Sequence, residues 1–130
     1  MDSENLYREQ LLEHYHHPRN AKPLLAPDFS AVEQNPSCGD QIRIEGRIED
    51  GIIKELGFVG AGCMLSQAAA SMVTEACKGK TVEQALSLNK DFIIGLIGIQ
   101  VGPTRLRCAL LSLSSLQQGL ISYLAKGSRA

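Results

Sequence analysis

The chain has 130 residues, a formal net charge of −1, and a hydrophobic share of 44% against a charged share of 21%. A chain of this length buries about two thirds of the surface it exposes when unfolded, which suffices for one core. We therefore expect a single domain over residues 1–130. The balanced charge and the lack of a long basic run argue against nucleic acid as a partner.

The terminal and apolar segments predict a cytoplasmic protein without a membrane partner. Residues 1–10 show no basic segment followed by an apolar run, so they do not resemble a signal peptide. The most apolar late stretch, residues 92–102, is too short and too rich in glycine to span a bilayer. Thiols stay reduced in the cytoplasm, so we expect the four cysteines to be ligands, nucleophiles or core residues.

The N-terminal segment predicts a helix followed by a loop. Apolar side chains recur at helical spacing over residues 4–16, from Tyr7 to Tyr15. Residues 18–27 contain three prolines and are expected to form a loop. Because this region shows few anchoring features, we expect residues 1–20 to be mobile in the absence of a partner.

The next segments predict a small antiparallel sheet. Residues 28–34 are compatible with a short strand, and residues 41–49 alternate between apolar and polar side chains as a half-buried strand does. The Asp-Gly pair at residues 50–51 favours a hairpin turn, from which residues 52–60 return as the second arm.

The remaining segments predict helices. Residues 63–79 are small and apolar nearly all round, which predicts a buried helix with Gly79 as its C-cap. Thr81 is a suitable N-cap for a short surface helix. Residues 91–99 are ambiguous because two glycines interrupt them, whereas leucines at helical spacing define a last helix over residues 106–124. This order predicts an α+β fold, with helices on one face of the sheet.

Three of the four cysteines stand at predicted element boundaries. Cys38 precedes the first hairpin strand, Cys63 begins the buried helix, and Cys108 lies near the start of the last helix. Such boundaries can converge, and with Asp40 they would supply three sulfurs and one oxygen, donors that zinc and iron accept. Gly39 permits a tight turn between Cys38 and Asp40. The carboxylate is the weaker partner of a soft metal, so it is the bond we expect to break on release.

The neighbours of two cysteines favour the thiolate form. The amides of the helix that starts at Cys63 favour a negative charge there, and the positive charge of Arg107 does the same for Cys108. Cys77 lies fourteen residues after Cys63, or about 21 Å along an unbroken helix, so we expect it in the core.

The residues alone leave other interpretations open. The cysteines could simply be small buried side chains, since the chain has no C-x-x-C pair. A zinc-stabilised interaction module would hold its metal in a closed site. A cysteine hydrolase using Cys63 would need a histidine base, and all three histidines lie within residues 14–17. Those histidines form either a metal-binding tract or, as we prefer, a polar helix end.

Five ordered motifs resemble the iron–sulfur cluster assembly scaffold family, which comprises IscU, the N-terminal domain of NifU, and SufU. The resemblance spans about residues 5–124. The motifs are EHYHHPRN, NPSCGDQ, GAGCMLSQAAASM, KGKTVEQAL and RLRCALLSL.

The resemblance implies a three-stranded antiparallel sheet with helices on one face, and a carrier role rather than an enzymatic one. In this family a cysteine desulfurase of the IscS, SufS or NifS type supplies sulfur, and a [2Fe–2S] cluster is built and passed to apo iron–sulfur acceptor proteins. The implied ligands of iron, of the cluster or of zinc are Cys38, Asp40, Cys63 and Cys108. We expect Cys108 to be the first candidate for the persulfide acceptor, because a loop position and Arg107 would give an exposed anion, and Cys38 to be the second.

Departures from the family pattern leave two functions open. Arg107 stands where IscU proteins have a histidine, and it and GAGC resemble SufU. SufU proteins usually carry an insertion before the last motif, and residues 87–108 are too short to contain it. The segment VGPTR, residues 101–105, replaces the motif read by an Hsp70-type chaperone, which argues against that partner. The chain is thus either a cluster scaffold or a zinc-dependent sulfur acceptor that stimulates a desulfurase.

Overall fold

The computed structural model describes residues 3–36 and 39–127; residues 1–2, 37–38 and 128–130 lie outside the described part. In chain order the elements are α1 (Ser3–His16), β1 (Phe29–Asn35), β2 (Asp40–Glu49), β3 (Ile52–Ala61), α2 (Met64–Cys77), α3 (Val82–Leu86), α4 (Lys90–Ile97) and α5 (Pro103–Gly127).

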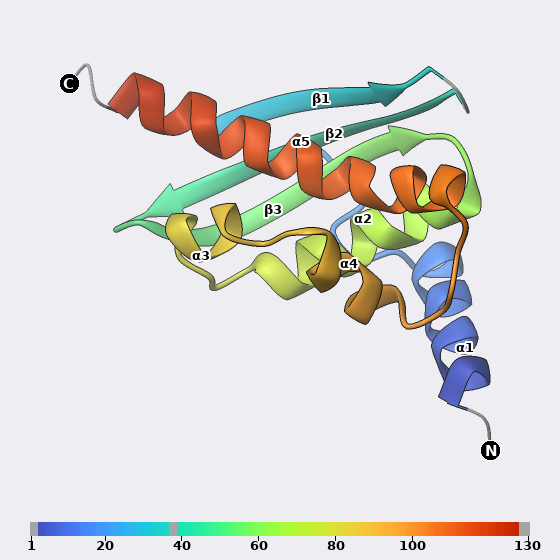
Figure 1. Cartoon of the computed structure of the whole chain (residues 1–130). Coiled ribbons are helices and arrows are strands. Elements are labelled where there is room, and N and C mark those ends of the chain that lie inside the picture. Colours follow the sequence, from blue (N-terminus) through green and yellow to red (C-terminus); the bar gives the residue numbers. More distant parts are fainter. Residues whose placement is uncertain (1–2, 37–38, 128–130) are drawn as a thin grey trace.

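The three strands form one antiparallel sheet in the order β1-β2-β3 (Figure 1). Ile42 and Ile44 of β2 are fully buried, whereas Arg43 between them is exposed, so the predicted alternation is confirmed. The β2–β3 hairpin turns at Asp50 and Gly51, with φ angles of 55° and 74°. Two left-handed residues match the twist of the flanking strands, which is why Asp-Gly occurs here.

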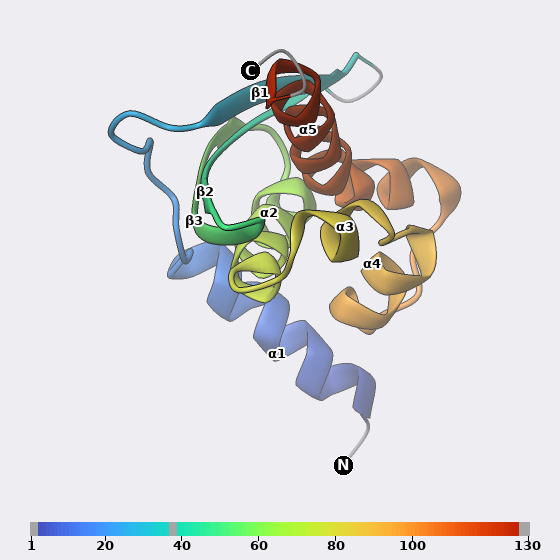
Figure 2. The same cartoon turned by 90° about the vertical axis from the view of Figure 1, so that its left-hand side faces the viewer.

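Two long helices cover one face of the sheet (Figure 2). α5 packs on β1 and β2, and α2 packs on α5, on α1 and on β3. The alanines at 68–70 of α2 are fully buried, and their small size lets the helix approach its neighbours closely. The predicted α+β architecture, a three-stranded antiparallel sheet with helices packed on one face, is therefore confirmed.

The Phe29 ring packs between α5 and the sheet. A Cβ atom placed on Gly46 of β2 or on Gly119 of α5 would collide with the Phe29 ring. The two glycines thus leave room for one buried aromatic side chain where β1, β2 and α5 meet. This contact fixes the position of α5 along the sheet. The N-terminal end of α5 consequently lies at the end of the sheet where β2 begins (Figure 1).

Local signals explain the ends of the shorter helices. α3 begins at Thr81 with a reciprocal capping box to Gln84, as an N-cap there predicts. The ambiguous segment forms α4, and Gly98 ends it in the left-handed conformation, with φ of 68°. α5 begins at Pro103, earlier than residue 106, because proline suits the first helical position.

One predicted helix end was wrong. α2 ends at Cys77, and Lys78 is already extended, with φ of −61° and ψ of 131°. The N–H of Gly79 then donates to the carbonyl of Ile53 rather than to its own helix. Gly79 has a positive φ of 88°, but it joins the end of α2 to β3 through this hydrogen bond and does not cap the helix.

The expectation of few anchoring features in the N-terminal region was also wrong. His14 Nδ1 lies 2.7 Å from Ser71 Oγ, and the N–H of Arg19 donates to the same oxygen at 2.8 Å. Asn20 Nδ2 donates to Thr74 Oγ1 at 3.2 Å, and Asn20 O accepts from the N–H of Phe58. Buried polar side chains of α2 therefore hold α1 and the following loop. The mobility of residues 1–20 stays a prediction.

None of the helices within the described residues is long and apolar enough to cross a bilayer.

Candidate metal and sulfur site

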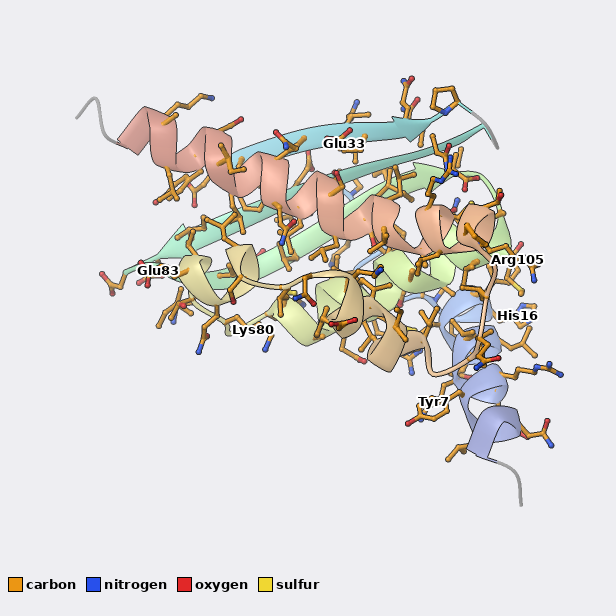
Figure 3. All side chains as sticks on the ribbon, in the orientation of Figure 1. Tyr7, His16, Glu33, Lys80, Glu83 and Arg105 are labelled. Atoms are coloured by element: carbon orange, nitrogen blue, oxygen red, sulfur yellow. The ribbon has the colours of Figure 1, made fainter. Side chains whose placement is uncertain are left out.

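The candidate site lies at one end of the sheet, where several elements begin or end. β2 starts there, β3 runs into α2 there, and α5 starts there (Figure 1). In Figure 3, Arg105 marks this end at the first turn of α5, while Lys80 and Glu83 lie at the opposite end of the molecule. Residues far apart in the sequence can therefore meet here.

Asp40, Cys63 and Cys108 meet at this end. One ligand atom from each lies within 4.8 Å of the other two. Asp40 is the first residue of β2, Cys63 is the N-cap residue of α2, and Cys108 lies in the second turn of α5. Two sulfurs and a carboxylate oxygen at this spacing are donors that suit zinc or iron. Three separate elements thus supply the set.

Asp40 is buried and tied to Cys63. The residue is only 1% exposed. Its Oδ1 accepts the backbone N–H of Cys63 at 2.8 Å, and its Oδ2 lies 3.4 Å from Cys63 Sγ. A carboxylate that accepts the first amide of α2 also benefits from the positive end of the helix. A Cβ on Gly62 would strike this carboxylate, so glycine there gives Asp40 its space.

The two described site cysteines differ in exposure. Cys63 is exposed, and its Sγ lies 3.8 Å from Ser66 Oγ. Cys108 is 4% exposed, and its Sγ lies 3.5 Å from the carbonyl oxygen of Thr104, one turn earlier in α5. The expectation that Cys108 would sit on an exposed loop was therefore wrong. α5 starts at Pro103, about one turn earlier than predicted, so Cys108 lies in the second turn of the helix.

The structure gives a partial account of the other predicted site residues. Cys38 lies outside the described residues, so its place relative to Asp40 stays a prediction. Arg107 is exposed and lines a shallow cavity of about 260 Å³ together with Glu33 and Asn35 of β1. Its role in activating the Cys108 thiolate remains a proposal.

Cys77 is a core residue, as its position on the helix predicts. It is fully buried, and burial raises the pKa of its thiol to about 11. A thiol with this pKa stays protonated at neutral pH, which makes it a poor nucleophile and a poor ligand.

The histidines do not join the site in the described part of the chain, where the group of potential ligands contains Asp40, Cys63 and Cys108. His14 is 9% exposed and packs against Ser71. The prediction that the histidines form a polar helix end was therefore only partly correct. Burial, followed by the charge of Arg19, lowers the pKa of His14. Since His14 is engaged with α2, nothing supports it as the base that a Cys63 hydrolase would need.

Sequence reasoning missed Asn35. This residue ends β1 directly opposite Asp40, and its Nδ2 lies 4.0 Å from Cys108 Sγ. Its position as the first residue of the NPSCGDQ motif gave a hint, because the last residue of one strand of a hairpin pairs with the first residue of the next.

Comparison with known proteins places the chain in a family. Residues 6–130 match the model of the NifU-like N-terminal domain. The chain belongs to this family. As a NifU-like N-terminal domain, it is similar to the zinc-dependent sulfurtransferase SufU of Bacillus subtilis, with 37% identity covering 90% of each protein. It is also similar to the iron–sulfur cluster assembly scaffold protein IscU of Aquifex aeolicus, with 35% identity covering 95% of this chain and 79% of that protein.

Solved structures of NifU-like domains share the fold. The protein FiSufU of Fervidobacterium islandicum aligns with a TM-score of 0.77 at 21% identity, covering 92% of this chain and 99% of that one. The N-terminal part of a NifU-like protein from Brucella abortus aligns with a TM-score of 0.73 at 18% identity, covering 95% and 96%. The family match and the similarity to SufU and IscU proteins confirm the resemblance to the iron–sulfur cluster assembly scaffold family, and these structures confirm its fold.

Proposed function

We propose that this protein is a scaffold on which a [2Fe–2S] cluster is built and from which it passes to apo iron–sulfur acceptor proteins. The observation that supports the proposal is the meeting of Asp40, Cys63 and Cys108 within 4.8 Å at the ends of three elements. Cys38, two residues before Asp40, is the proposed fourth ligand. The relatives named as scaffold proteins support the same reading.

The donor set suits a cargo that must leave. A shell of four thiolates would hold iron or zinc more firmly than three thiolates and a carboxylate. Asp40 is already bonded to the N–H of Cys63, so its carboxylate has a stable position when it is not a ligand. The exposed Cys63 opens the site to a partner on one side. These features favour transfer over permanent storage.

Sulfur is proposed to come from a cysteine desulfurase of the IscS, SufS or NifS type. A site thiolate attacks the outer sulfur of the desulfurase persulfide, forms a new S–S bond, and releases the desulfurase cysteine as a thiolate. Cys108 and Cys38 are the proposed acceptors, with Arg107 favouring the Cys108 thiolate. Because Cys108 is 4% exposed, sulfur transfer to it requires the first turns of α5 to open. We propose that this chemistry takes place in the cytoplasm.

A zinc-dependent sulfur acceptor of the SufU type is the second candidate. The 37% identity to a protein named for that activity favours it, as does Arg107. The SufU alignment has 134 positions but this chain has 130 residues, so the relative has residues with no counterpart here. That difference agrees with the expected lack of the SufU insertion. In this function zinc would be held by Cys38, Asp40, Cys63 and Cys108 and would orient the thiolates.

One experiment separates the two functions. The protein is incubated anaerobically with ferrous iron, cysteine, a cysteine desulfurase and dithiothreitol, which reduces the persulfide sulfur to sulfide. The visible spectrum is followed before and after adding an apo-ferredoxin. The scaffold function predicts a cluster chromophore on this protein that then moves to the ferredoxin. If no chromophore forms, and if removing zinc abolishes stimulation of the desulfurase, the zinc-dependent sulfur acceptor is the correct function.

A further inference from the structure

Asn35 contacts the site through both its backbone and its side chain. It is the last residue of β1 and stands directly opposite Asp40 in the β1–β2 register. Its carbonyl oxygen accepts the N–H of Gly39, the residue before Asp40, at 2.9 Å. Its side-chain Nδ2 donates toward Cys108 Sγ at 4.0 Å, and the residue is only 9% exposed. Asn35 thus contacts both β2, which begins with Asp40, and α5, which carries Cys108.

We propose that Asn35 is a positioning residue that holds Cys108 Sγ toward Asp40 and Cys63 and donates a hydrogen bond to that sulfur when it binds metal. The part that concerns bound metal rests on the proposed function. The part that concerns the orientation of Cys108 does not, because the contact exists in the metal-free protein.

Two groups close to Cys108 Sγ differ in what they can do. The carbonyl oxygen of Thr104, at 3.5 Å, is an acceptor and can bond only to a protonated thiol. A sulfur bound to metal carries no proton, so it loses that bond. The amide of Asn35 is a donor, and it can still bond to a metal-bound sulfur. Asn35 therefore favours the arrangement in which Cys108 is a ligand.

This geometry is typical of groups that tune a metal site from just outside the ligand shell. A hydrogen bond to a metal-bound thiolate withdraws electron density from the sulfur and fixes its direction. Burial strengthens the effect, because little water competes for the sulfur at a residue that is 4% exposed. Removing such partners commonly reduces metal affinity by about 10-fold or more.

The test compares Asn35→Ala and Asn35→Asp with the wild type and with Gln34→Ala. Aspartate keeps the shape of asparagine but has no N–H to donate. Gln34 is the matched control, because it is the adjacent residue on β1 and its exposed side chain bonds to Gln41 across the strand pair. Circular dichroism and thermal unfolding first establish that each variant folds.

The first readout is the absorption of the cobalt(II)-loaded proteins. Loss of the amide donor makes the sulfur a stronger electron donor, so the sulfur-to-cobalt band moves to longer wavelength in Asn35→Ala and Asn35→Asp. The band stays in place in Gln34→Ala. Cobalt affinity falls by about 10-fold or more in the two Asn35 variants. A purely structural role would reduce cobalt binding without moving the band, and an unmoved band in both Asn35 variants overturns the proposal for bound metal.

The second readout uses metal-free protein and mass spectrometry of iodoacetamide labelling. Asn35→Ala frees Cys108 Sγ to turn outward, so Cys108 is labelled faster while the labelling of Cys63 is unchanged. Equal labelling of Cys108 in Asn35→Ala and in the wild type overturns the positioning role. If wild-type cobalt shows no sulfur band at all, the proposed function fails, but the labelling result still decides the contact.

Discussion

At the scale of single residues, the site depends on how Asp40 is held. A buried carboxylate needs hydrogen-bond partners, and the N–H of Cys63 supplies one at 2.8 Å. That bond also satisfies an amide at the start of α2, where a side-chain cap from Cys63 itself is missing. The same contact therefore stabilises the helix start and places the ligand.

Gly62→Ala should disrupt this arrangement. An added Cβ would collide with the Asp40 carboxylate, and the φ of 138° at Gly62 is unfavourable for any other residue. Zinc affinity, measured by competition with a chromogenic chelator, should fall by about 10-fold or more. Gly102→Ala is the matched control, because a Cβ at Gly102 has open space around it. Wild-type affinity in Gly62→Ala would show that the position of Asp40 does not matter.

The cysteines should react with iodoacetamide in the order of their exposure. In the metal-free protein Cys63 is labelled first, Cys108 more slowly, and Cys77 last, because burial protects Cys77 and raises its pKa to about 11. Mass spectrometry of peptides at successive times checks this order. Labelling of Cys108 ahead of Cys63 would contradict the burial of Cys108 in α5.

Much of the site at this scale could be predicted from the sequence, since Asp40, Cys63 and Cys108 meet as their places at element boundaries suggest. The burial of Cys108 could not be predicted, because it depends on how the first turns of α5 pack against the end of the sheet. The contact of Asn35 with Cys108 depends on packing between β1 and α5 and leaves no local pattern in the sequence.

At the scale of elements, α5 supports the outer strand through a side chain as well as through apolar packing. Ser115 Oγ donates to the carbonyl oxygen of Ala31 in β1 at 2.7 Å. Ser112 is equally buried on the same helix, but its Oγ has no hydrogen-bond partner among the described residues. A side chain of α5 thus supplies a hydrogen-bond donor to one carbonyl group of the edge strand β1.

The two serines give a matched pair of variants. Ser115→Ala should lower the free energy of unfolding by about 1 kcal/mol, because it leaves the Ala31 carbonyl without this donor. Ser112→Ala removes a buried hydroxyl that forms no bond, so the free energy of unfolding should stay the same or rise. Urea unfolding measures both. A larger loss from Ser112→Ala than from Ser115→Ala would contradict the assignment.

The attachment of α1 to α2 should depend on pH. Burial and the charge of Arg19 lower the pKa of His14 below its ordinary value of 6.5, although Glu75 and Glu13 oppose the shift. The unfolded chain therefore binds a proton at His14 more readily than the folded chain. The stability that neutral His14 provides is present above pH 6.5 and is lost as the pH falls from 6.5 through the folded-state pKa.

Thermal unfolding at about pH 7.5 and about pH 5.5 tests this dependence. The wild type should lose more stability on acidification than His14→Gln, which cannot titrate at that position. His16→Gln is the control, because His16 is exposed and should retain the wild-type response. An identical response in the wild type and in His14→Gln would contradict a stabilising role for neutral His14.

The elements themselves were largely predictable, because alternation, the Asp-Gly turn and the leucine spacing are local signals. Two errors came from tertiary contacts. Gly79 looked like a helix cap, but its N–H bonds to Ile53 across the fold. The anchoring of α1 rests on Ser71 and Thr74, which in the sequence look like ordinary residues of a buried helix.

At the scale of the whole molecule, the sheet and the helices packed on it bring the proposed metal ligands together at one end. Asp40 comes from the start of β2, Cys63 from the junction of β3 and α2, and Cys108 from α5. Phe29, between Gly46 and Gly119, fixes α5 along the sheet. Metal binding should therefore stabilise the whole fold, since the ligands belong to separate elements that unfolding would pull apart.

The most direct test of the account is X-ray absorption spectroscopy of the zinc-loaded protein together with metal analysis of the wild type and of single substitutions at Cys38, Asp40, Cys63 and Cys108. We predict one zinc per chain with a shell of three sulfurs and one oxygen, and reduced zinc binding in each variant. A shell that contains nitrogen, or full zinc binding after replacement of Cys63 or Cys108, would contradict the claim that these side chains form one site.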